Sequence, residues 1–363
     1  MGDDTQRSYP PSARLDENDR RLLDAIQQGM PLDECPYYGL AQGLGLAEQD
    51  VLDRLERIRS EGLISRISAI FDTRSLGYDS VLVAAKYAPE QVDGAAEIVN
   101  QHPGVSHNYL RTAEYNLWYT LAVPPDSRLG LERTAAKLSE LSGAVSYRLL
   151  PAERVFKIGV RLSLLEDPAE TSSAAPVGEP AMPERDAACG ERRRTWEITP
   201  EIKAAILGLQ EDLPIEPQPF HRLARKYHLD VKRMLKLGQE MLAGGIMRRY
   251  AAVLRHRKVG FGVNCMTVWS VPAGRVDEVG AALASFGEVT HCYLRPSWPD
   301  WPYNLYGMVH CRSDEQCRDL IERMKGVTGI TDMLGVFSTK EYKKVRLQYF
   351  SPAFAEWEAR HAS

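Results

Sequence analysis

The chain has 363 residues, of which 44% are hydrophobic and 26% charged, and its formal net charge is −4. This length exceeds one ordinary core, and the composition is typical of a soluble globular protein with two or more domains. The negative charge disfavours a protein that depends on phosphate contacts, and no apolar run approaches the roughly 18 residues of a membrane-spanning helix. We expect no secretory signal in residues 1–14, which lack an apolar stretch.

Cysteine spacing favours reduced thiols in a cytoplasmic protein. The six cysteines form no CxxC pair and no zinc-ribbon pattern. The sequence therefore predicts no metal site.

The first ordered segment has a helical period. Asp16 is a plausible N-cap for a helix with an apolar stripe at Leu22, Leu23 and Ile26. Two further helical patterns follow, separated by a glycine turn at Gly45 and closed by Gly62. This order predicts a helix-turn-helix unit.

After Gly62 the apolar period changes to two. Strands are predicted at 63–72, 81–87 and around His107, and then at 117–123 and 155–162, with helices between them at 91–101 and 131–141. The predicted order is β-β-α-β-β-α-β, which contains the elements of a ferredoxin-like domain.

The same order recurs in the second half of the chain. HNYLR at His107 returns as HCYLR at His291, 184 positions later, and Gly77-Tyr78 returns as Gly260-Phe261, 183 positions later. The second copy carries four extra residues, within PSWPDWP. We therefore predict an α+β fold built by tandem duplication of a helix-turn-helix domain and a ferredoxin-like (βαββαβ-type) domain. The predicted segments are a flexible tail at 1–14, helix-turn-helix domains at 15–64 and 196–247, ferredoxin-like domains at 65–162 and 248–350, a linker at 163–195, and a C-terminal tail at 351–363.

Each repeated strand carries His, Tyr and Arg at alternate positions. Side chains alternate along a strand, so His291, Tyr293 and Arg295 share one face while Cys292 takes the other. A polar triplet of this kind is poorly suited to a core and well suited to a binding site.

A helix-turn-helix followed by a ferredoxin-like sheet resembles the leucine-responsive/asparagine regulators. The blocks HNYLR…YNLWYT and HCYLRP…WPYNLYGMVH resemble the siroheme decarboxylases more closely. That family normally has two related subunits, and here they look fused head to tail, as in the heme d1 version. The resemblance implies a regulator-like fold and an internal pseudo-dimer, and it leaves a homodimer of the chain open.

The activity implied by the resemblance is that of a carboxy-lyase. It would remove CO2 from the C12 and C18 acetates of siroheme, giving 12,18-didecarboxysiroheme for heme d1 or alternative heme synthesis. The iron belongs to the substrate, so no cofactor is implied. The expected partners are siroheme, its products and other heme d1 enzymes, without a membrane and without DNA.

A polycarboxylate macrocycle needs cations, flat walls and a proton donor. We expect His291 and His107 to transfer protons or contact the iron, Arg295 and Arg111 to orient carboxylates, and Tyr293 and Tyr109 to place the substrate. Further substrate contacts are expected from basic, aromatic and amide side chains: Arg66, Arg248, Arg249, Trp298, Trp301, Tyr303, Tyr115, Asn304 and Asn116.

Several alternatives remain open from the sequence. The Trp298–Trp301 loop could be a hydrophobic plug, and Arg66 and Arg249 could be solvated strand ends. One of the two sites could be inactive. The Trp/Pro insertion favours the second site as the active one, because it gives that site additional side chains for substrate contact.

Two other functions compete with the decarboxylase. A DNA-binding regulator is disfavoured by the acids in 48–56, although 230–236 is basic enough to leave it open. A non-catalytic heme-binding sensor would bind tetrapyrrole and return it unchanged.

Overall fold

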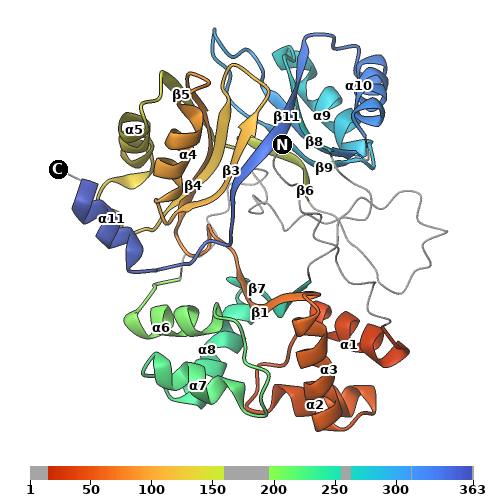
Figure 1. The fold of residues 1–363 in the computed structure, drawn as a ribbon, viewed down its shortest axis with the longest axis vertical. Coiled ribbons are helices and arrows are strands. Elements are labelled where there is room, and N and C mark those ends of the chain that lie inside the picture. The colour runs from red at the N-terminus through yellow and green to blue at the C-terminus, as the bar shows by residue number, and fades with distance from the viewer. Residues whose placement is uncertain (1–14, 159–195, 255–262, 312, 362–363) are drawn as a thin grey trace, which may run out of the picture. The chain divides into compact units, whose positions relative to one another are not determined.

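The computed structural model describes residues 15–158, 196–254, 263–311 and 313–361 (Figure 1). These residues form two compact units, which are described separately. One contains 15–70 and 208–254, and the other contains most of the remaining described chain. The predicted tail at 1–14 and nearly all of the predicted linker at 163–195 lie outside the described residues.

The helical unit contains two sets of three helices. The first set is α1 (Glu17–Gln28), α2 (Pro36–Leu44) and α3 (Glu48–Ser60), and the second is α6 (Pro200–Leu209), α7 (Pro219–Lys226) and α8 (Val231–Ala243), with α6 divided between the units at Gly208. Asp16 caps α1 through a reciprocal capping box with Asp19, as its position before the apolar stripe predicted. The predicted helical repeat is therefore present in both copies.

The first strand of each repeat lies with the helices. β1 (Ile64–Phe71) pairs with β7 (Met247–Leu254) in a two-stranded sheet, whereas the sequence had placed both strands in the ferredoxin-like domains. The amide of Leu213 donates to the carbonyl of Ile67, and the Ile67 amide donates to the Asp212 carboxylate. These bonds tie β1 to the helical unit, which extends along the chain to Ile70.

The sheet unit is built from two βαββαβ repeats (Figure 1). The first contains β2 (Asp79–Lys86), α4 (Val92–Asn100), β3 (Val105–Arg111), β4 (Leu117–Val123), α5 (Gly130–Ser142), β5 (Ser146–Leu150) and β6 (Arg154–Ile158). The second contains β8 (Val263–Trp269), the short helix η1 (Ala273–Arg275), α9 (Val276–Ser285), β9 (Val289–Leu294), β10 (Leu305–Cys311), α10 (Asp314–Thr328) and β11 (Met333–Lys344). The predicted duplication of a ferredoxin-like domain is confirmed.

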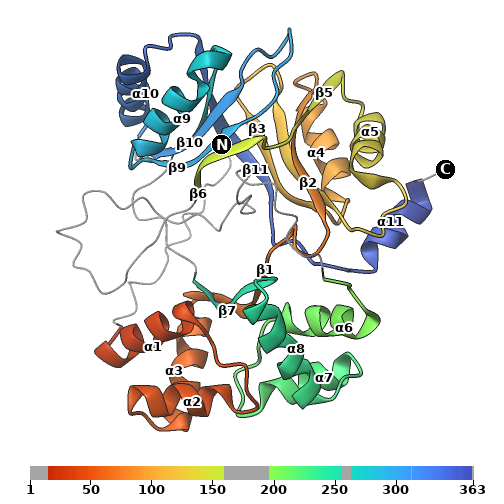
Figure 2. The same cartoon turned by 180° about the vertical axis from the view of Figure 1, so that it is seen from behind.

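The last strand of each repeat crosses into the other repeat. The sheet order is β5-β2-β4-β3-β11-β8-β10-β9-β6, and β11 pairs with β8 through its first residues and with β3 through its last. In the mirror arrangement, β6 pairs with β9, as Figure 2 shows. Gly280 permits this second exchange, because a Cβ there would lie 2.4 Å from the Phe156 ring. The two repeats therefore form one continuous hydrogen-bonded sheet.

Three apolar clusters stabilise the sheet unit. Two of them pack the strands of each repeat against its own helices, and the third joins the opposite faces of the two half-sheets. This third cluster includes Trp118 and Leu150 from the first repeat and Met266, Trp301 and Tyr306 from the second. The strand faces that point away from the helices, here called the inner faces, therefore pack against each other.

The predicted C-terminal tail at 351–363 contains a packed helix. α11 (Ala353–His361) buries Phe354 and Trp357, and Trp357 belongs to the core of the first repeat. Glu358 accepts hydrogen bonds from the Ser127 hydroxyl and the Arg128 amide, at the start of α5. The prediction was wrong because the segment is too short to show a helical period, although its Trp and Phe were a usable signal.

Candidate functional site

The His-Tyr-Arg triplet of β3 lies on the inner face. Asn108, between them, points to the helices and donates to Asn100, while Arg111 lies over the rings of Tyr109 and Trp118 at 5.4 and 5.8 Å. The rings of His107 and Tyr109 stack with centroids 6.3 Å apart. The alternation therefore produces the shared polar face that the sequence predicted.

The second repeat reproduces this arrangement on β9. His291 stacks on Tyr293 with centroids 6.1 Å apart, and Arg295 lies 4.9 Å from the Tyr293 ring. Cys292 is buried in the helix-side core instead. The two triplets thus occupy equivalent places on the two inner faces.

Both arginines reach the main chain of the opposite repeat. Arg111 Nη1 donates to the carbonyl oxygen of Val336 at 3.3 Å, and Arg295 Nη1 donates to that of Leu150. Burial lowers the pKa of Arg111 to about 10, which still leaves it cationic at neutral pH. Its Nε has no hydrogen-bond partner among the described residues, so a donor remains available to an anionic ligand.

His291 belongs to a hydrogen-bonded chain that the sequence did not predict. Its Nδ1 lies 3.0 Å from the Thr290 hydroxyl, which lies 3.2 Å from Nε2 of His310. His310 Nδ1 lies 2.6 Å from Oδ1 of Asn264, whose side chain is exposed. His310 alternates in β10 with the inner-face residues Tyr306 and Met308, a period-two signal that could have identified it.

The pKa values of both histidines are depressed. Burial, with the neighbouring His310 and Arg295 side chains, lowers the pKa of His291 to about 4. Burial also lowers the pKa of His310 to about 4, helped by Lys344 and Arg111. Both imidazoles are therefore neutral at neutral pH.

The first repeat has a shorter chain at the same place. His107 Nδ1 lies 3.0 Å from the Ser106 hydroxyl, which lies 2.8 Å from the Thr120 hydroxyl. Ala122 stands where the second repeat has His310, at the spacing that relates Asn116 to Asn304. The two sites therefore differ in their supporting groups although their triplets match.

The inserted loop of the second repeat packs against the first repeat. Trp301 is only 3% exposed, and it contacts Tyr115 and Trp118 edge-on while its Nε1 donates to Tyr306. Asp300 accepts a hydrogen bond from Tyr115 and pairs with Arg148. This geometry fits the hydrophobic-plug interpretation of Trp301, whereas Trp298 and Tyr303 are only partly buried.

The two predicted asparagines bind main chain. Asn116 both accepts from the amide of Tyr87 and donates to its carbonyl, at 3.0 and 2.9 Å. Asn304 makes the same pair of bonds to Val271, at 2.9 and 2.8 Å. Each amide is thereby used to hold the loop that follows β2 or β8.

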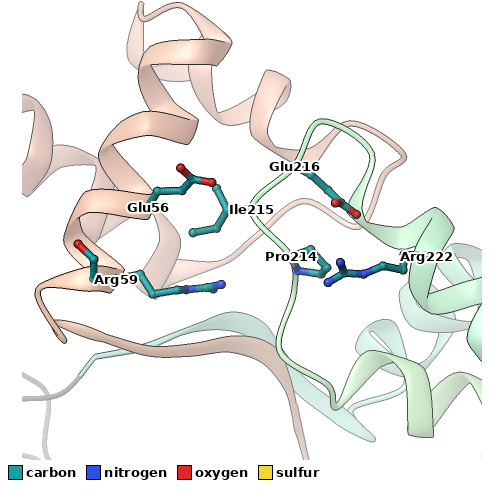
Figure 3. Close-up of a pocket in the computed structure, with 7 residues that line it drawn as sticks. Glu56, Arg59, Pro214, Ile215, Glu216 and Arg222 are labelled. Carbon is teal, nitrogen blue, oxygen red and sulfur yellow. The ribbon is translucent and has the colours of Figure 1, made fainter.

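The three remaining predicted arginines belong to the helical unit. Arg66 lies on β1, and Arg248 and Arg249 lie on β7, so the structure does not bring them together with the triplets within one unit. A hollow of about 440 Å³ in this unit is lined by Glu56, Arg59, Glu216 and Arg222 among others. Figure 3 shows these side chains. The two carboxylates of the hollow offset its two guanidinium groups, so it is poorly suited to a polycarboxylate.

The fold and site define a regulator-like protein in which two ligand-binding domains are joined in one chain. The model of the AsnC-like ligand binding domain matches residues 75–157 and 258–343, and that of the siroheme decarboxylase NirDL-like HTH domain matches residues 19–64. The chain belongs to the siroheme decarboxylase family, in a single-chain form, because a curated member aligns over nearly its whole length.

That member is the siroheme decarboxylase of Hydrogenobacter thermophilus, 36% identical over 93% of this chain and 96% of its own. The siroheme decarboxylase alpha subunit of Desulfovibrio desulfuricans is 42% identical over 46% of this chain and 94% of its own, as expected for a fused form. A crystal structure of the siroheme decarboxylase NirDL in co-complex with an iron-uroporphyrin III analogue superposes with a TM-score of 0.74 at 32% identity, covering 95% of this chain and 98% of that chain. Among the described residues, none of the helices is long and apolar enough to cross a membrane.

Proposed function

We propose that this protein is a carboxy-lyase that decarboxylates siroheme. It removes CO2 from the C12 and C18 acetates and yields 12,18-didecarboxysiroheme for heme d1 synthesis. The observation that carries the proposal is near full-length similarity to a siroheme decarboxylase, in a chain with two inner-face His-Tyr-Arg triplets. A relative crystallised with an iron-uroporphyrin analogue supports a tetrapyrrole as the ligand.

The arginines and the histidines of the triplets have different roles in the proposed reaction. Arg111 and Arg295 bring buried positive charge to the inner faces, where it attracts and orients carboxylates. Loss of CO2 breaks a carbon–carbon bond and leaves its electron pair on the methylene carbon, delocalised into the pyrrole. Nε2 of His291 is buried, without a hydrogen-bond partner among the described residues, and therefore suits delivery of a proton to that carbon.

The stacked tyrosines provide walls for a flat ring. Tyr109 and Tyr293 each lie between an imidazole and a guanidinium group on their strand. Their aromatic faces and hydroxyl groups suit contact with a macrocycle that has acidic substituents. The iron arrives with the substrate, so the proposal needs no further cofactor.

A direct test is anaerobic incubation of the purified chain with siroheme, followed by mass spectrometry of the tetrapyrrole. The expected products have lost one and then two molecules of CO2. Siroheme returned with unchanged mass, although bound, would instead identify a tetrapyrrole sensor or carrier.

The helix-turn-helix does not favour the DNA-binding alternative. In α3, Arg54 and Arg57 both donate to the buried carboxylate of Asp19, and Arg54 also pairs with Asp50. These guanidinium groups are therefore engaged within the protein. Gel shifts with the protein's own upstream DNA provide the check, and salt-sensitive specific binding at nanomolar concentration would restore the regulator hypothesis.

A further inference from the structure

A neutral imidazole is a poor proton donor unless its other nitrogen is reprotonated. The depressed pKa of His291 means that it carries one proton at neutral pH. If that proton leaves from Nε2 without replacement, an imidazolate anion remains in a buried setting, which is very costly. Donation from His291 therefore calls for a proton source at Nδ1.

The structure contains such a source. Nδ1 of His291 faces the Thr290 hydroxyl at 3.0 Å, and that hydroxyl faces Nε2 of His310 at 3.2 Å. His310 continues at 2.6 Å to Asn264, whose side chain is exposed. The first two distances suit hydrogen bonds, and the third is a short one in which His310 Nδ1 donates to the Asn264 oxygen. A continuous hydrogen-bonded chain therefore joins His291, through Thr290, to an imidazole that is bonded to an exposed residue.

We propose that Thr290 and His310 form a proton relay that reloads His291 from solvent as the substrate loses CO2. This inference rests on the proposed decarboxylation. It adds a route and two residues, Thr290 and His310, that neither the triplet nor the family comparison identifies.

The protons balance at each link. His291 Nε2 gives its proton to the methylene carbon, which forms a C–H bond with the electron pair left by CO2. The Thr290 hydroxyl gives its proton to His291 Nδ1, and His310 Nε2 gives its proton to the Thr290 oxygen. His310 Nδ1 keeps the proton that it donates to Asn264 Oδ1, so His310 first takes up a proton from water at Nε2 and then passes that proton on to Thr290. Every protein group ends neutral, and one solvent proton is consumed for each CO2.

The first repeat has different groups at this place. There His107 Nδ1 faces the Ser106 hydroxyl, which faces the Thr120 hydroxyl, and Ala122 stands at the position of the second imidazole. A hydroxyl group passes a proton only when a neighbour supplies another. The relay therefore assigns the reloading of a proton donor to the second repeat.

Two substitutions separate proton transfer from folding. Thr290→Val removes the hydroxyl with little change in volume, and His310→Gln keeps a polar side chain of similar reach that does not shuttle protons. Thr339→Val is the matched control, because this exposed hydroxyl on β11 donates to the carbonyl of Leu110. We expect kcat to fall by about a hundredfold in the first two, which is the lower end of the range for general acid–base catalysis. The KM and the siroheme affinity from absorbance titration should remain within about twofold, and imidazole in solution should partly restore His310→Gly.

The outcomes distinguish the relay from the activity. If the unaltered protein releases CO2 while Thr290→Val and His310→Gln keep full kcat, the relay is wrong and the decarboxylase stands. Loss of siroheme affinity in place of kcat, or a changed absorption spectrum of bound siroheme at unchanged kcat, shows a binding role and also overturns it. Siroheme returned unchanged by the unaltered protein defeats both proposals.

Discussion

Arg295 of the second repeat donates a hydrogen bond to the main-chain oxygen of Leu150 in the first, and Arg111 repeats this contact in reverse with Val336. Leu150 and Val336 are equivalent, because their strand partners Leu82 and Met266 are 184 positions apart. Each positive charge is thus held at the inner face by the opposite repeat. The two halves therefore complete each other's triplets.

Replacing the arginines with methionine should separate binding from folding. We expect Arg111→Met and Arg295→Met each to weaken siroheme binding by about tenfold to a hundredfold, since a hydrogen bond to a charged group contributes about 1.5–3 kcal/mol. Stability should change little, because methionine fills the space and removes a buried charge. Absorbance titration and urea unfolding measure the two effects. Arg133→Met, on the exposed side of α5, is the control, and unchanged affinity in both inner-face variants would contradict the prediction.

Trp301 should contribute strongly to stability. Its side chain fills the space between Tyr115, Trp118 and Tyr306, so Trp301→Ala leaves a cavity in the shared core. The expected loss is about 3–5 kcal/mol in the free energy of unfolding. Trp298→Ala, at a partly exposed position, should cost clearly less. Equal losses for the two variants in urea unfolding would argue against the plug.

Asn116 and Asn304 should contribute to stability and not to substrate binding. Each makes two hydrogen bonds to one main-chain residue, and alanine leaves those peptide groups without their partner. Asn116→Ala and Asn304→Ala should each lower the free energy of unfolding by about 1–3 kcal/mol. The KM for siroheme should stay constant in protein that remains folded. A raised KM with unchanged stability would return these residues to the substrate-binding set.

Buried histidines predict a loss of stability in acid. Burial, with Lys343 and His361, lowers the pKa of His102 to about 3, while His291 and His310 fall to about 4. In the unfolded chain these histidines bind protons near pH 6.5, whereas in the folded chain they remain neutral down to a much lower pH. The free energy of unfolding therefore decreases as the pH falls below about 6.5. Each such group contributes about 1.4 kcal/mol per pH unit across that window.

His102→Gln tests this slope while keeping an acceptor for the Gly104 amide. Urea unfolding between about pH 7 and about pH 5 should show a dependence on pH that is smaller by about 1.4 kcal/mol per unit in the variant. A variant with the slope of the unaltered protein would show that His102 is protonated in the folded state.

The two triplet histidines should differ in their effect on turnover. His291→Ala and His107→Ala are both expected to lower kcat more than siroheme affinity. His291→Ala should have the larger effect, by about tenfold or more, because His291 is joined through Thr290 to a second imidazole, whereas Ala122 stands at that position in the first repeat. Single-turnover decarboxylation followed by mass spectrometry measures both. Full rates in both variants would remove the proton-donor assignment.

The sequence alone determined the repeat and the composition of each triplet. The period of two places His, Tyr and Arg on one face regardless of tertiary context, and α1 forms after Asp16 because its cap and apolar stripe are local. The spacing of 184 positions between His107 and His291 likewise revealed the duplication without reference to any contact.

Only the tertiary structure decided what surrounds these residues. Pairing of β11 with β3 and of β6 with β9 joins segments far apart in the chain, and local patterns carry no information about such partners. The same holds for Trp301, whose burial depends on Tyr115 and Trp118 of the other repeat. His310 becomes a neighbour of His291 only when β10 lies beside β9, because cross-strand distance is set by register and not by position in the sequence.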